Sequence, residues 1–218
     1  MVQKVVHLDR VAFGSQELTL TIEAGESVVI EVDSDASVDH LFQLLTGLST
    51  PERGDIILFG EELVSLSTKD LTHLRSLIGV VPNRGGLLSN LNLWENLLLP
   101  LAYHRPSPRE EQKRAAEEAL SLVGYRGDVY ANSSSLSPFE RRQVMIARAI
   151  LIAPQLFLYA ASNAGLNPRE RGAIQEIFAV IQLQLPQTTF CAITSERGFG
   201  NKMSAVRRIE LLAGDNHL

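Results

Sequence analysis

Residues 27–59 have the sequence SVVIEVDSDASVDHLFQLLTGLSTPERGDIILF, and their pattern indicates the class of fold. Its first part, 27–32, is an apolar, β-branched run bounded by a turn and an acidic loop, which predicts a buried strand. Over 38–48, apolar residues recur at steps of three and four, as on one face of a helix. Turn-forming residues then precede a second apolar run at 55–59. The stretch therefore predicts a strand, a loop, a helix, a turn and a second strand.

The rest of the chain alternates helices and strands around a helical middle. Ser, Pro and Glu in capping-box spacing open two predicted helices, 107–124 and 137–150. The remaining patterns predict a helix over 169–185 and strands over 156–159, 188–194 and 208–212. We therefore expect an α/β fold in a single domain over 1–218, with a helical subdomain at approximately 84–152.

The composition of the chain limits the classes of function that it can have. The 218 residues are 45% hydrophobic and 21% charged, which suits one domain with a substantial core. A net charge of -5 does not favour nucleic acid as a partner. The single cysteine, Cys191, excludes an internal disulfide framework. The N-terminal residues contain no apolar signal segment, and polar residues interrupt both apolar stretches, so we expect a cytoplasmic chain without membrane spans.

Three stretches together resemble, in order and spacing, the ATPase subunits of ABC transporters. They are LLTGLSTPERGDIILFGEEL at 44–63, IGVVPNRGGLLSNLNLWENLLLPLAY at 78–103 and LSPFERRQVMIARAILIAPQLFLY at 136–159. The middle stretch is similar to the ATPases of the bacterial Mla and Mce lipid-transport systems. The resemblance implies a P-loop NTPase-like fold with a RecA-like core, an antiparallel β region and an inserted α-helical subdomain. It also implies ATP and Mg²⁺ as cofactors and ATP hydrolysis coupled to transport.

The phosphate-binding loop of this family, G-x-x-G-x-G-K-S/T, has almost no counterpart here. The three glycine positions, which allow tight turns around phosphate, hold Val32, Asp35 and Ser37. Val38 stands in place of the lysine that reaches the β- and γ-phosphates, and Asp39 replaces the magnesium-binding serine or threonine. The resemblance therefore implies a site whose phosphate-binding groups are missing.

Carboxylates surround the same loop. Glu31, Asp33, Asp35 and Asp39 place negative charge where a phosphate tail would sit. Two like charges about 5 Å apart repel by roughly 3 kcal/mol at an effective dielectric near 20. A metal site is the alternative, but the Gly and terminal Glu of an EF-hand loop are absent. We expect no metal and interpret the acids as solvated N-terminal residues of the helix, which Asp35 or Ser37 caps.

The other positions of the family's phosphoryl-transfer machinery have changed as well. Asn83 stands at the glutamine-loop position, and Asn167 replaces the D-loop aspartate. Ala160 and Ala161 replace the Walker B aspartate, which would hold Mg²⁺, and the glutamate, which would polarise the attacking water. Ser195 occupies the position of the switch histidine. The resemblance therefore predicts a pseudo-ATPase with no catalytic, cofactor-binding or metal-binding residues.

The signature motif of the family, L-S-G-G-Q, reads Leu-Ser-Pro-Phe-Glu at 136–140. Phe139 and Glu140 would hinder the close approach to the phosphate loop of an opposite subunit that the glycines allow. Ser137, Pro138 and Glu140 also make an ordinary helix start, and we favour this structural interpretation. The resemblance further offers Phe13 as a counterpart of the aromatic residue that stacks on adenine.

Apolar residues after the glutamine-loop position have two interpretations. They are core residues at helical spacing, or they line the groove that in relatives receives a helix of the membrane subunit. As a candidate partner interface we select Asn83, Leu87, Leu88, Leu91 and Trp94.

Three functions follow from these patterns. The first is a non-catalytic ATPase-like subunit that docks on an ABC permease of a lipid-transport system and pairs with an active ATPase or with itself. Such a subunit would lie at the inner face of the cell membrane. The second is a divergent ABC ATPase that still binds or hydrolyses ATP. The third is a soluble regulatory scaffold.

Overall fold

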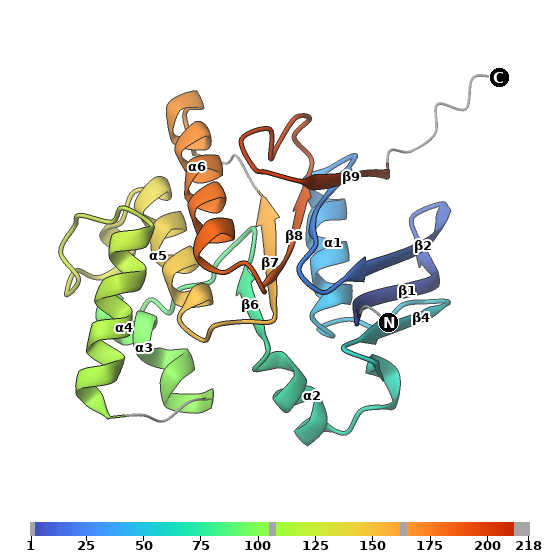
Figure 1. Cartoon of the computed structure of the whole chain (residues 1–218), viewed down its shortest axis with the longest axis horizontal. Coiled ribbons are helices and arrows are strands. Elements are labelled where there is room, and N and C mark those ends of the chain that lie inside the picture. The colour runs from blue at the N-terminus through green and yellow to red at the C-terminus, as the bar shows by residue number, and fades with distance from the viewer. Residues whose placement is uncertain (1–2, 105–107, 162–164, 212–218) are drawn as a thin grey trace.

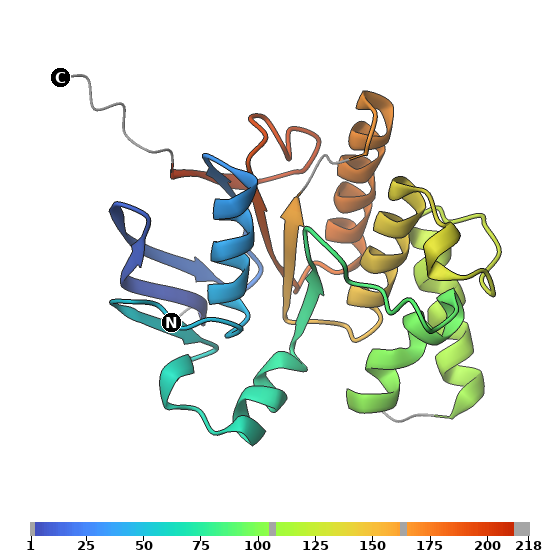
Figure 2. The same cartoon turned by 180° about the vertical axis from the view of Figure 1, so that it is seen from behind.

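A computed structural model of the protein describes residues 3–104, 108–161 and 165–211. Two β-sheets lie side by side, and helices cover the larger one on both faces (Figures 1 and 2). The elements in chain order are β1 (Lys4–Phe13), β2 (Gln16–Glu23), β3 (Ser27–Val32), α1 (Asp35–Leu45), β4 (Asp55–Leu58), β5 (Glu61–Glu62), η1 (Leu63–Ser65), α2 (Thr68–Arg75), β6 (Ile78–Val81), α3 (Leu93–His104), α4 (Arg109–Leu122), η2 (Ser133–Ser135), α5 (Pro138–Ile150), β7 (Leu156–Ala161), α6 (Pro168–Gln184), β8 (Thr189–Thr194) and β9 (Val206–Leu211).

The larger sheet is parallel, with the strand order β6-β7-β8-β3-β9. Its central strands are buried along their whole length, as expected for a sheet with helices on both faces. The side chains of β7 alternate accordingly. Leu158 and Ala160 face α1, whereas Phe157 and Tyr159 face the cluster that includes α5 and α6.

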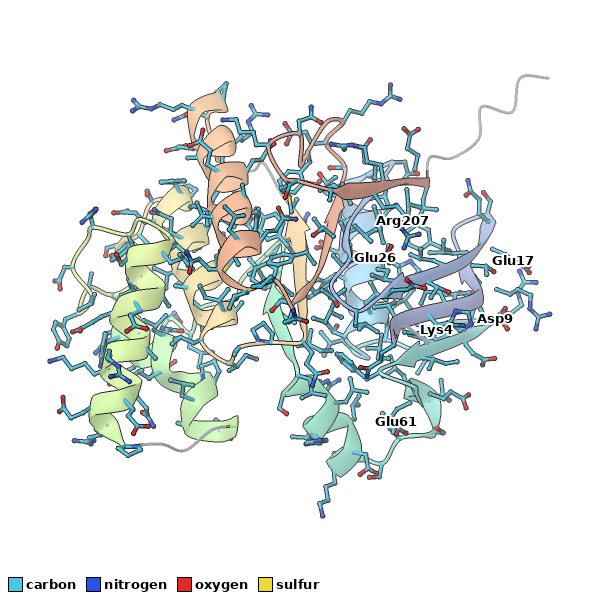
Figure 3. All side chains as sticks on the ribbon, in the orientation of Figure 1. Lys4, Asp9, Glu17, Glu26, Glu61 and Arg207 are labelled. Atoms are coloured by element: carbon cyan, nitrogen blue, oxygen red, sulfur yellow. The ribbon has the colours of Figure 1, made fainter. Side chains whose placement is uncertain are left out.

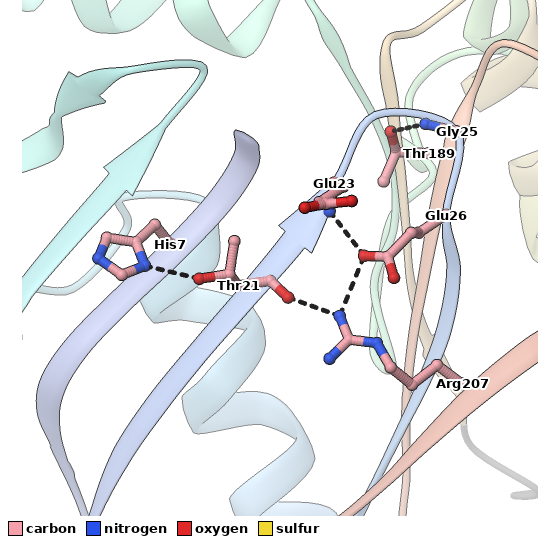
Figure 4. Close-up of polar contacts among 7 residues, drawn as sticks. All are labelled: His7, Thr21, Glu23, Gly25, Glu26, Thr189 and Arg207. Carbon is pink, nitrogen blue, oxygen red and sulfur yellow. Dashed lines mark hydrogen bonds and ion pairs between the residues drawn. The ribbon is translucent and has the colours of Figure 1, made fainter. Parts of the chain in front are cut away.

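The smaller sheet is antiparallel, with the order β2-β1-β4-β5, and α1 lies between it and the parallel sheet (Figure 1). Its exposed surface carries charged side chains, among them Lys4, Glu17 and Glu61 (Figure 3). Polar contacts join the two sheets (Figure 4). Arg207 of β9 donates to the carbonyl oxygen of Thr21 at 2.5 Å and to Glu26 Oε2 at 3.0 Å.

The helical part consists of α3, α4 and α5, which pack on one another and on the parallel sheet. Helix α5 lies so close to β6 that a Cβ on Gly79 would stand 2.4 Å from the carbonyl oxygen of Ala149. In the part of the chain that the structure describes, no helix has the length and apolarity needed to cross a bilayer. The predicted α/β architecture, with a parallel core, an antiparallel region and inserted helices, is confirmed.

Two predicted details of helix α1 were wrong, and one predicted residue of α4 lies outside the described residues. Helix α1 begins at Asp35 and ends at Leu45, and its N-cap is Ser34 rather than Asp35 or Ser37. Leu48, which we placed on the buried face of this helix, is 65% exposed, because the chain turns away at Gly47 with φ of +64°. Ser107, the predicted cap of α4, lies outside the described residues.

Candidate functional site

The candidate site lies at the carboxyl ends of three neighbouring parallel strands, β7, β8 and β3. Ligands of open parallel sheets bind in the crevice outside the carboxyl ends of the strands. Here β7 ends at Ala161, β8 is followed by Ser195, and β3 leads through Asp33 and Ser34 into α1. The structure therefore brings the sequence-predicted phosphate-loop, Walker B and switch positions to one edge of the sheet.

Local hydrogen bonds hold the loop between β3 and α1. Ser34 Oγ accepts from the backbone N–H of Ser37 at 3.2 Å, which caps the helix. Ser37 Oγ in turn donates to Asp33 Oδ1 at 2.5 Å. The bond from the Ser37 hydroxyl, and smaller contributions from Ser34, lower the pKa of Asp33 below its ordinary value, despite the opposing effect of desolvation. Asp33 is therefore an ionised carboxylate at neutral pH.

Ser195, at the predicted switch position, contacts Asp35 of the predicted phosphate loop directly. Ser195 Oγ lies 2.6 Å from Asp35 Oδ1, across 160 residues of sequence. The serine hydroxyl is the donor, and the carboxylate oxygen accepts. A hydrogen bond within the chain thus spans the space between the end of β8 and the first turn of α1.

The two residues at the lysine and magnesium-ligand positions differ in exposure. Val38 is completely buried in the core between α1 and the sheets. Asp39 is partly exposed, and its Oδ2 lies 3.7 Å from Nε of Arg84. Arg84 is 80% exposed, so this ion pair is screened by water. The pair nevertheless brings a cation close to the loop, which the sequence patterns did not predict.

One carboxylate that we assigned to the loop lies elsewhere, so that expectation was wrong. Glu31 is buried, and its Oε1 accepts from Arg208 Nη1 of β9 at 2.9 Å and from the backbone N–H of Gly198 at 3.2 Å. The parallel pairing of β3 with β9 explains this arrangement, because it places Glu31 beside β9. The acidic groups of the loop are therefore Asp33, Asp35 and Asp39.

The end of β7 is buried rather than open to a ligand. Ala160 is completely buried and Ala161 nearly so. Arg142 of α5, a residue that the sequence patterns missed, packs over the ring of Tyr159 at 5.5 Å. Its guanidinium donates to the carbonyl oxygens of Pro82 at 3.0 Å and of Ala160 at 3.4 Å. Arg142 thus fixes α5 to the ends of β6 and β7 through main-chain acceptors.

Asn83 and Asn167, which the sequence resemblance predicted at the glutamine-loop and D-loop positions, have different surroundings. Asn83 has a buried side-chain nitrogen, Nδ2, without a hydrogen-bond partner among the described residues. Asn167 is the N-cap of α6, and its Oδ1 accepts from the backbone N–H groups of Arg169 and Glu170, each at 3.0 Å. Glu170 completes a capping box. The side chain of Asn167 is therefore engaged in forming the helix start.

The predicted capping box at the signature position is confirmed. Ser137 Oγ accepts from the backbone N–H of Glu140 at 3.2 Å, and Glu140 Oε2 accepts from the backbone N–H of Ser137 at 2.9 Å. The bond from the Ser137 backbone is the main cause that lowers the pKa of Glu140. The ring of Phe139 packs partly against the core cluster of the helical part. This motif thus forms a helix start.

Phe13, the candidate adenine-stacking residue, stacks on His40 of α1. The ring centroids are 5.4 Å apart and the planes differ by 23°. Both rings line a cavity of about 360 Å³, together with the turn between β1 and β2 and the residues Asp33 and Ser37. This cavity adjoins the loop and combines two aromatic faces with an ionised carboxylate.

The candidate partner-interface residues lie on one segment but are not uniformly exposed. Leu88 is 47% exposed, whereas Leu87 and Trp94 pack partly against the core of the helical part. Asn83 and Leu91 are also half-buried. A residue that the patterns missed, the completely buried Asn96, holds this segment: its side chain bonds the backbone N–H of Leu88 at 2.7 Å and its carbonyl oxygen at 2.9 Å. In the described ranges, no group of three or more His, Cys, Asp or Glu side chains is placed to hold a metal ion.

Solved structures with the same architecture define the class of fold. A dimeric ATP-binding cassette in a post-hydrolysis state, bound to ADP and Pi, superposes with a TM-score of 0.79 at 21% identity, covering 94% of this chain and 96% of the other. The cbiO1 protein of Clostridium perfringens, part of an ABC transporter complex, matches with a TM-score of 0.73 at 20% identity, over 88% of this chain and 78% of the other. At this identity the likeness concerns the fold, which is that of the ATP-binding cassettes.

Sequence comparison identifies the family. Residues 15–159 match the family model described as ABC transporter, and the chain belongs to this family. The "Probable ribonucleotide transport ATP-binding protein mkl" of Mycobacterium tuberculosis is 33% identical over 181 residues, which are 81% of this chain and 50% of that protein. "Methionine import ATP-binding protein MetN 2" of Enterococcus faecalis is 31% identical over 89% of this chain and 54% of its own length. The chain spans about half the length of these curated relatives.

Proposed function

We propose that this chain is a non-catalytic, ATPase-like subunit of an ABC transport complex. The observation that carries the proposal is the site at the carboxyl edge of the parallel sheet, where Val38 is buried and Asp33 and Asp35 flank the helix start. ATP carries a multiply charged phosphate tail, and a phosphate loop holds it with glycine backbone amides and a lysine. The groups present here repel that tail instead.

The electrostatic energies favour a site that does not bind the phosphates of ATP. Repulsion between like unit charges about 5 Å apart is roughly 3 kcal/mol per pair before solvent screening, at an effective dielectric near 20. The dipole of the α1 N-terminus contributes only about 0.3–1 kcal/mol in favour of an anion. Three carboxylates, Asp33, Asp35 and Asp39, therefore oppose the attraction of a single helix dipole. Arg84, which is exposed and already close to Asp39, neutralises at most part of this charge.

The site also offers no side chains for the hydrolysis of ATP. Hydrolysis requires Mg²⁺ ligands and a base or polarising group for water. The methyl groups of Ala160 and Ala161 supply neither, and Ser195 is engaged with Asp35. ATP and Mg²⁺ therefore do not fit the residues at this site, and we derive no catalytic step.

A second candidate function is a divergent nucleotide-binding cassette, which two observations favour. The relatives described above are named ATP-binding proteins. The cavity of about 360 Å³ beside Phe13 and His40 offers aromatic faces on which a nucleotide base can stack. Binding through the base would leave the phosphates near Asp33, so it would be weak.

We further propose that the partners of the chain are an ABC permease and a second ATPase subunit, either an active one or another copy of this chain. This proposal extends from the family of the chain and from the relatives' printed roles in transport. It places the chain at the inner face of the membrane. A lipid as the transported molecule is proposed from the pattern in residues 78–101 alone; mass spectrometry of molecules that copurify with the complex tests it.

The function is tested in the assembled transporter. The ATPase rate of the complex is measured with the wild-type subunit and with a subunit carrying Ala160→Gly. Like the wild type, this variant has no magnesium-binding group at position 160. A non-catalytic subunit predicts equal rates, and removal of the whole subunit is predicted to slow the active partner. If instead the purified chain alone releases phosphate from Mg-ATP above a heat-denatured control, the proposal is wrong and the second candidate stands.

A further inference from the structure

The cavity beside the loop between β3 and α1 has a volume of about 360 Å³. Small-ligand sites in proteins have volumes of about 300–1,000 Å³, so this cavity has room for a small molecule or a single long side chain. Its walls come from β1, the loop after β3, helix α1 and the end of β9. The residues that matter here are Phe13, Asp33, Ala36, His40 and Leu211.

The wall of this cavity carries a negative charge. Asp33 lines it, and no lysine or arginine among the described residues does so. The carboxylate of Asp33 accepts from the neutral hydroxyl of Ser37, and this bond lowers its pKa. In the part of the chain that the structure describes, no cationic side chain forms an ion pair with Asp33. The cavity therefore holds an ionised carboxylate without a countercharge from those residues.

The charges on the neighbouring turns of α1 act in the same direction. Asp35 and Asp39 each add a negative charge close to Asp33 in the chain. The N-terminus of α1 opposes them with a partial charge of only about +0.5 from the helix dipole. Arg84 lies 3.7 Å from Asp39, but it is 80% exposed, so water screens its charge. The local field therefore favours a cation in the cavity.

Two aromatic rings in the wall indicate which kind of cation fits. Phe13 and His40 stack with their planes 23° apart, and His40 is exposed on the outer side of the pair. A guanidinium group is planar, so it can lie flat on a ring while its N–H groups point at a carboxylate. A carboxylate can accept two of these N–H groups at once, which an ammonium group does not match. Ala36 and Leu211 supply apolar surface for an aliphatic stem.

We propose that this cavity binds a guanidinium group on an aliphatic stem. The guanidinium donates to the carboxylate of Asp33 and lies against the ring of His40, and the stem contacts Ala36 and Leu211. The group belongs to a small guanidino compound or to an arginine side chain of another protein. The inference goes beyond the proposed function, which assigns no ligand to this part of the molecule.

The first test is an NMR titration of the purified chain with butylguanidinium at constant ionic strength. Butylurea is the control probe, because it has a similar planar head and the same stem but no charge. We expect butylguanidinium to shift the amide resonances of the β1–β2 turn and of the first turns of α1, with a dissociation constant on the order of 1 mM. Butylurea is expected to bind at least about tenfold more weakly.

Variants then test the two contacts separately. Asp33→Asn keeps the shape but removes the charge, and we expect it to weaken butylguanidinium binding about tenfold. Asp70→Asn is the matched control, because Asp70 also accepts from a serine hydroxyl at a helix start, that of Ser67 at 2.6 Å, but does not line the cavity. His40→Leu keeps apolar bulk without the aromatic ring and is expected to weaken binding severalfold. It tests the proposal independently if Asp33→Asn does not fold.

Two forms of arginine distinguish the sources of the guanidinium group. N-acetylarginine methylamide presents the side chain as a protein does, whereas free arginine carries charges on both termini. Tighter binding of the blocked form supports the proposal and assigns the cavity to an arginine side chain of another protein. Tighter binding of free arginine supports it and assigns the cavity to a small guanidino compound.

The proposal is overturned by any of four results: no saturable shift with butylguanidinium, shifts confined to residues away from the cavity, equal binding of butylurea, or wild-type affinity in Asp33→Asn. Such a failure leaves the proposed function standing, because a chain that binds no guanidinium can still be a non-catalytic subunit. A chain that hydrolyses ATP but binds butylguanidinium through Asp33 contradicts the proposed function and leaves the cavity assignment standing.

Discussion

Ser195 Oγ donates a hydrogen bond to Asp35 Oδ1 over 2.6 Å and so joins the end of β8 to the first turn of α1. The sequence resemblance predicts that these two residues stand at the switch and phosphate-loop positions of the ABC family. The contact lies at the surface, so water competes with it. The bond spans the space between the end of β8 and the first turn of α1.

The coupling between these two residues is measurable. We expect Ser195→Ala and Asp35→Asn each to lower the free energy of unfolding by up to about 1 kcal/mol, because an exposed charge-assisted bond is lost. The double variant is predicted to lose less than the sum of the two. Urea unfolding of the four proteins gives the interaction energy. Strictly additive losses would show that the contact has no energetic role.

Restoring the lysine alone is not expected to restore activity. Val38→Lys supplies the missing cation, but Ala160 and Ala161 still provide no magnesium or water ligand. The purified variant should release phosphate from Mg-ATP at the rate of the wild type. Val38→Met is the control for disturbed packing of this buried position. A rate above that of both other proteins would show that the remaining residues support hydrolysis.

The capping box of α5 makes stability depend on pH. Its hydrogen bonds hold the pKa of Glu140 below the ordinary value of 4.5. A carboxyl group with a depressed folded-state pKa stabilises the fold above its unfolded pKa, and this contribution is lost as the pH falls through the folded pKa. We expect Glu140→Gln, which keeps an acceptor oxygen, to reduce the loss of stability between about pH 5 and pH 3. Urea unfolding across this range measures it; equal pH slopes would contradict the assignment.

Asn96 is predicted to stabilise the loop before α3. Its amide bonds Leu88 through both the backbone N–H and the carbonyl oxygen, and reaches the carbonyl of Leu91 at 3.2 Å. Asn96→Ala removes these partly buried bonds, although the Leu88 carbonyl oxygen keeps its bond from Ser133 Oγ at 3.1 Å, and we expect a loss of about 1–3 kcal/mol in the free energy of unfolding. The exposed Asn90→Ala is the control. Equal thermal unfolding of both variants would show that the bonds are dispensable.

Features fixed by neighbouring residues were predictable from the sequence. The capping box of Ser137 and Glu140 needs only residues three apart. The strand predicted over 156–159 needs only a continuous apolar run, and the observed strand, Leu156–Ala161, extends two residues further. The start of α1 was misplaced because several cap-forming residues adjoin one another, and Ser34 is the one whose geometry fits. The local sequence pattern does not distinguish Ser34 from Asp35 or Ser37 as the cap.

Features that depend on distant pairing were not predictable. Glu31 meets Arg208 across 177 residues, through the parallel pairing of β3 with β9, so an acid that seemed to belong to the loop is bound elsewhere. Arg142 occurs in a run that reads as an ordinary amphipathic helix. Its bonds to the carbonyl oxygens of Pro82 and Ala160 emerge only when α5 is packed against the parallel sheet.

We propose that the carboxylates of the loop and the missing lysine prevent nucleotide binding. Isothermal titration of the purified chain with millimolar ATP and Mg²⁺ tests it most directly, because a dissociation constant near 1 mM still corresponds to about 4 kcal/mol. We predict no saturable heat. Saturable heat that disappears when Phe13 is replaced by Ala would contradict this account and place a nucleotide in the cavity beside His40.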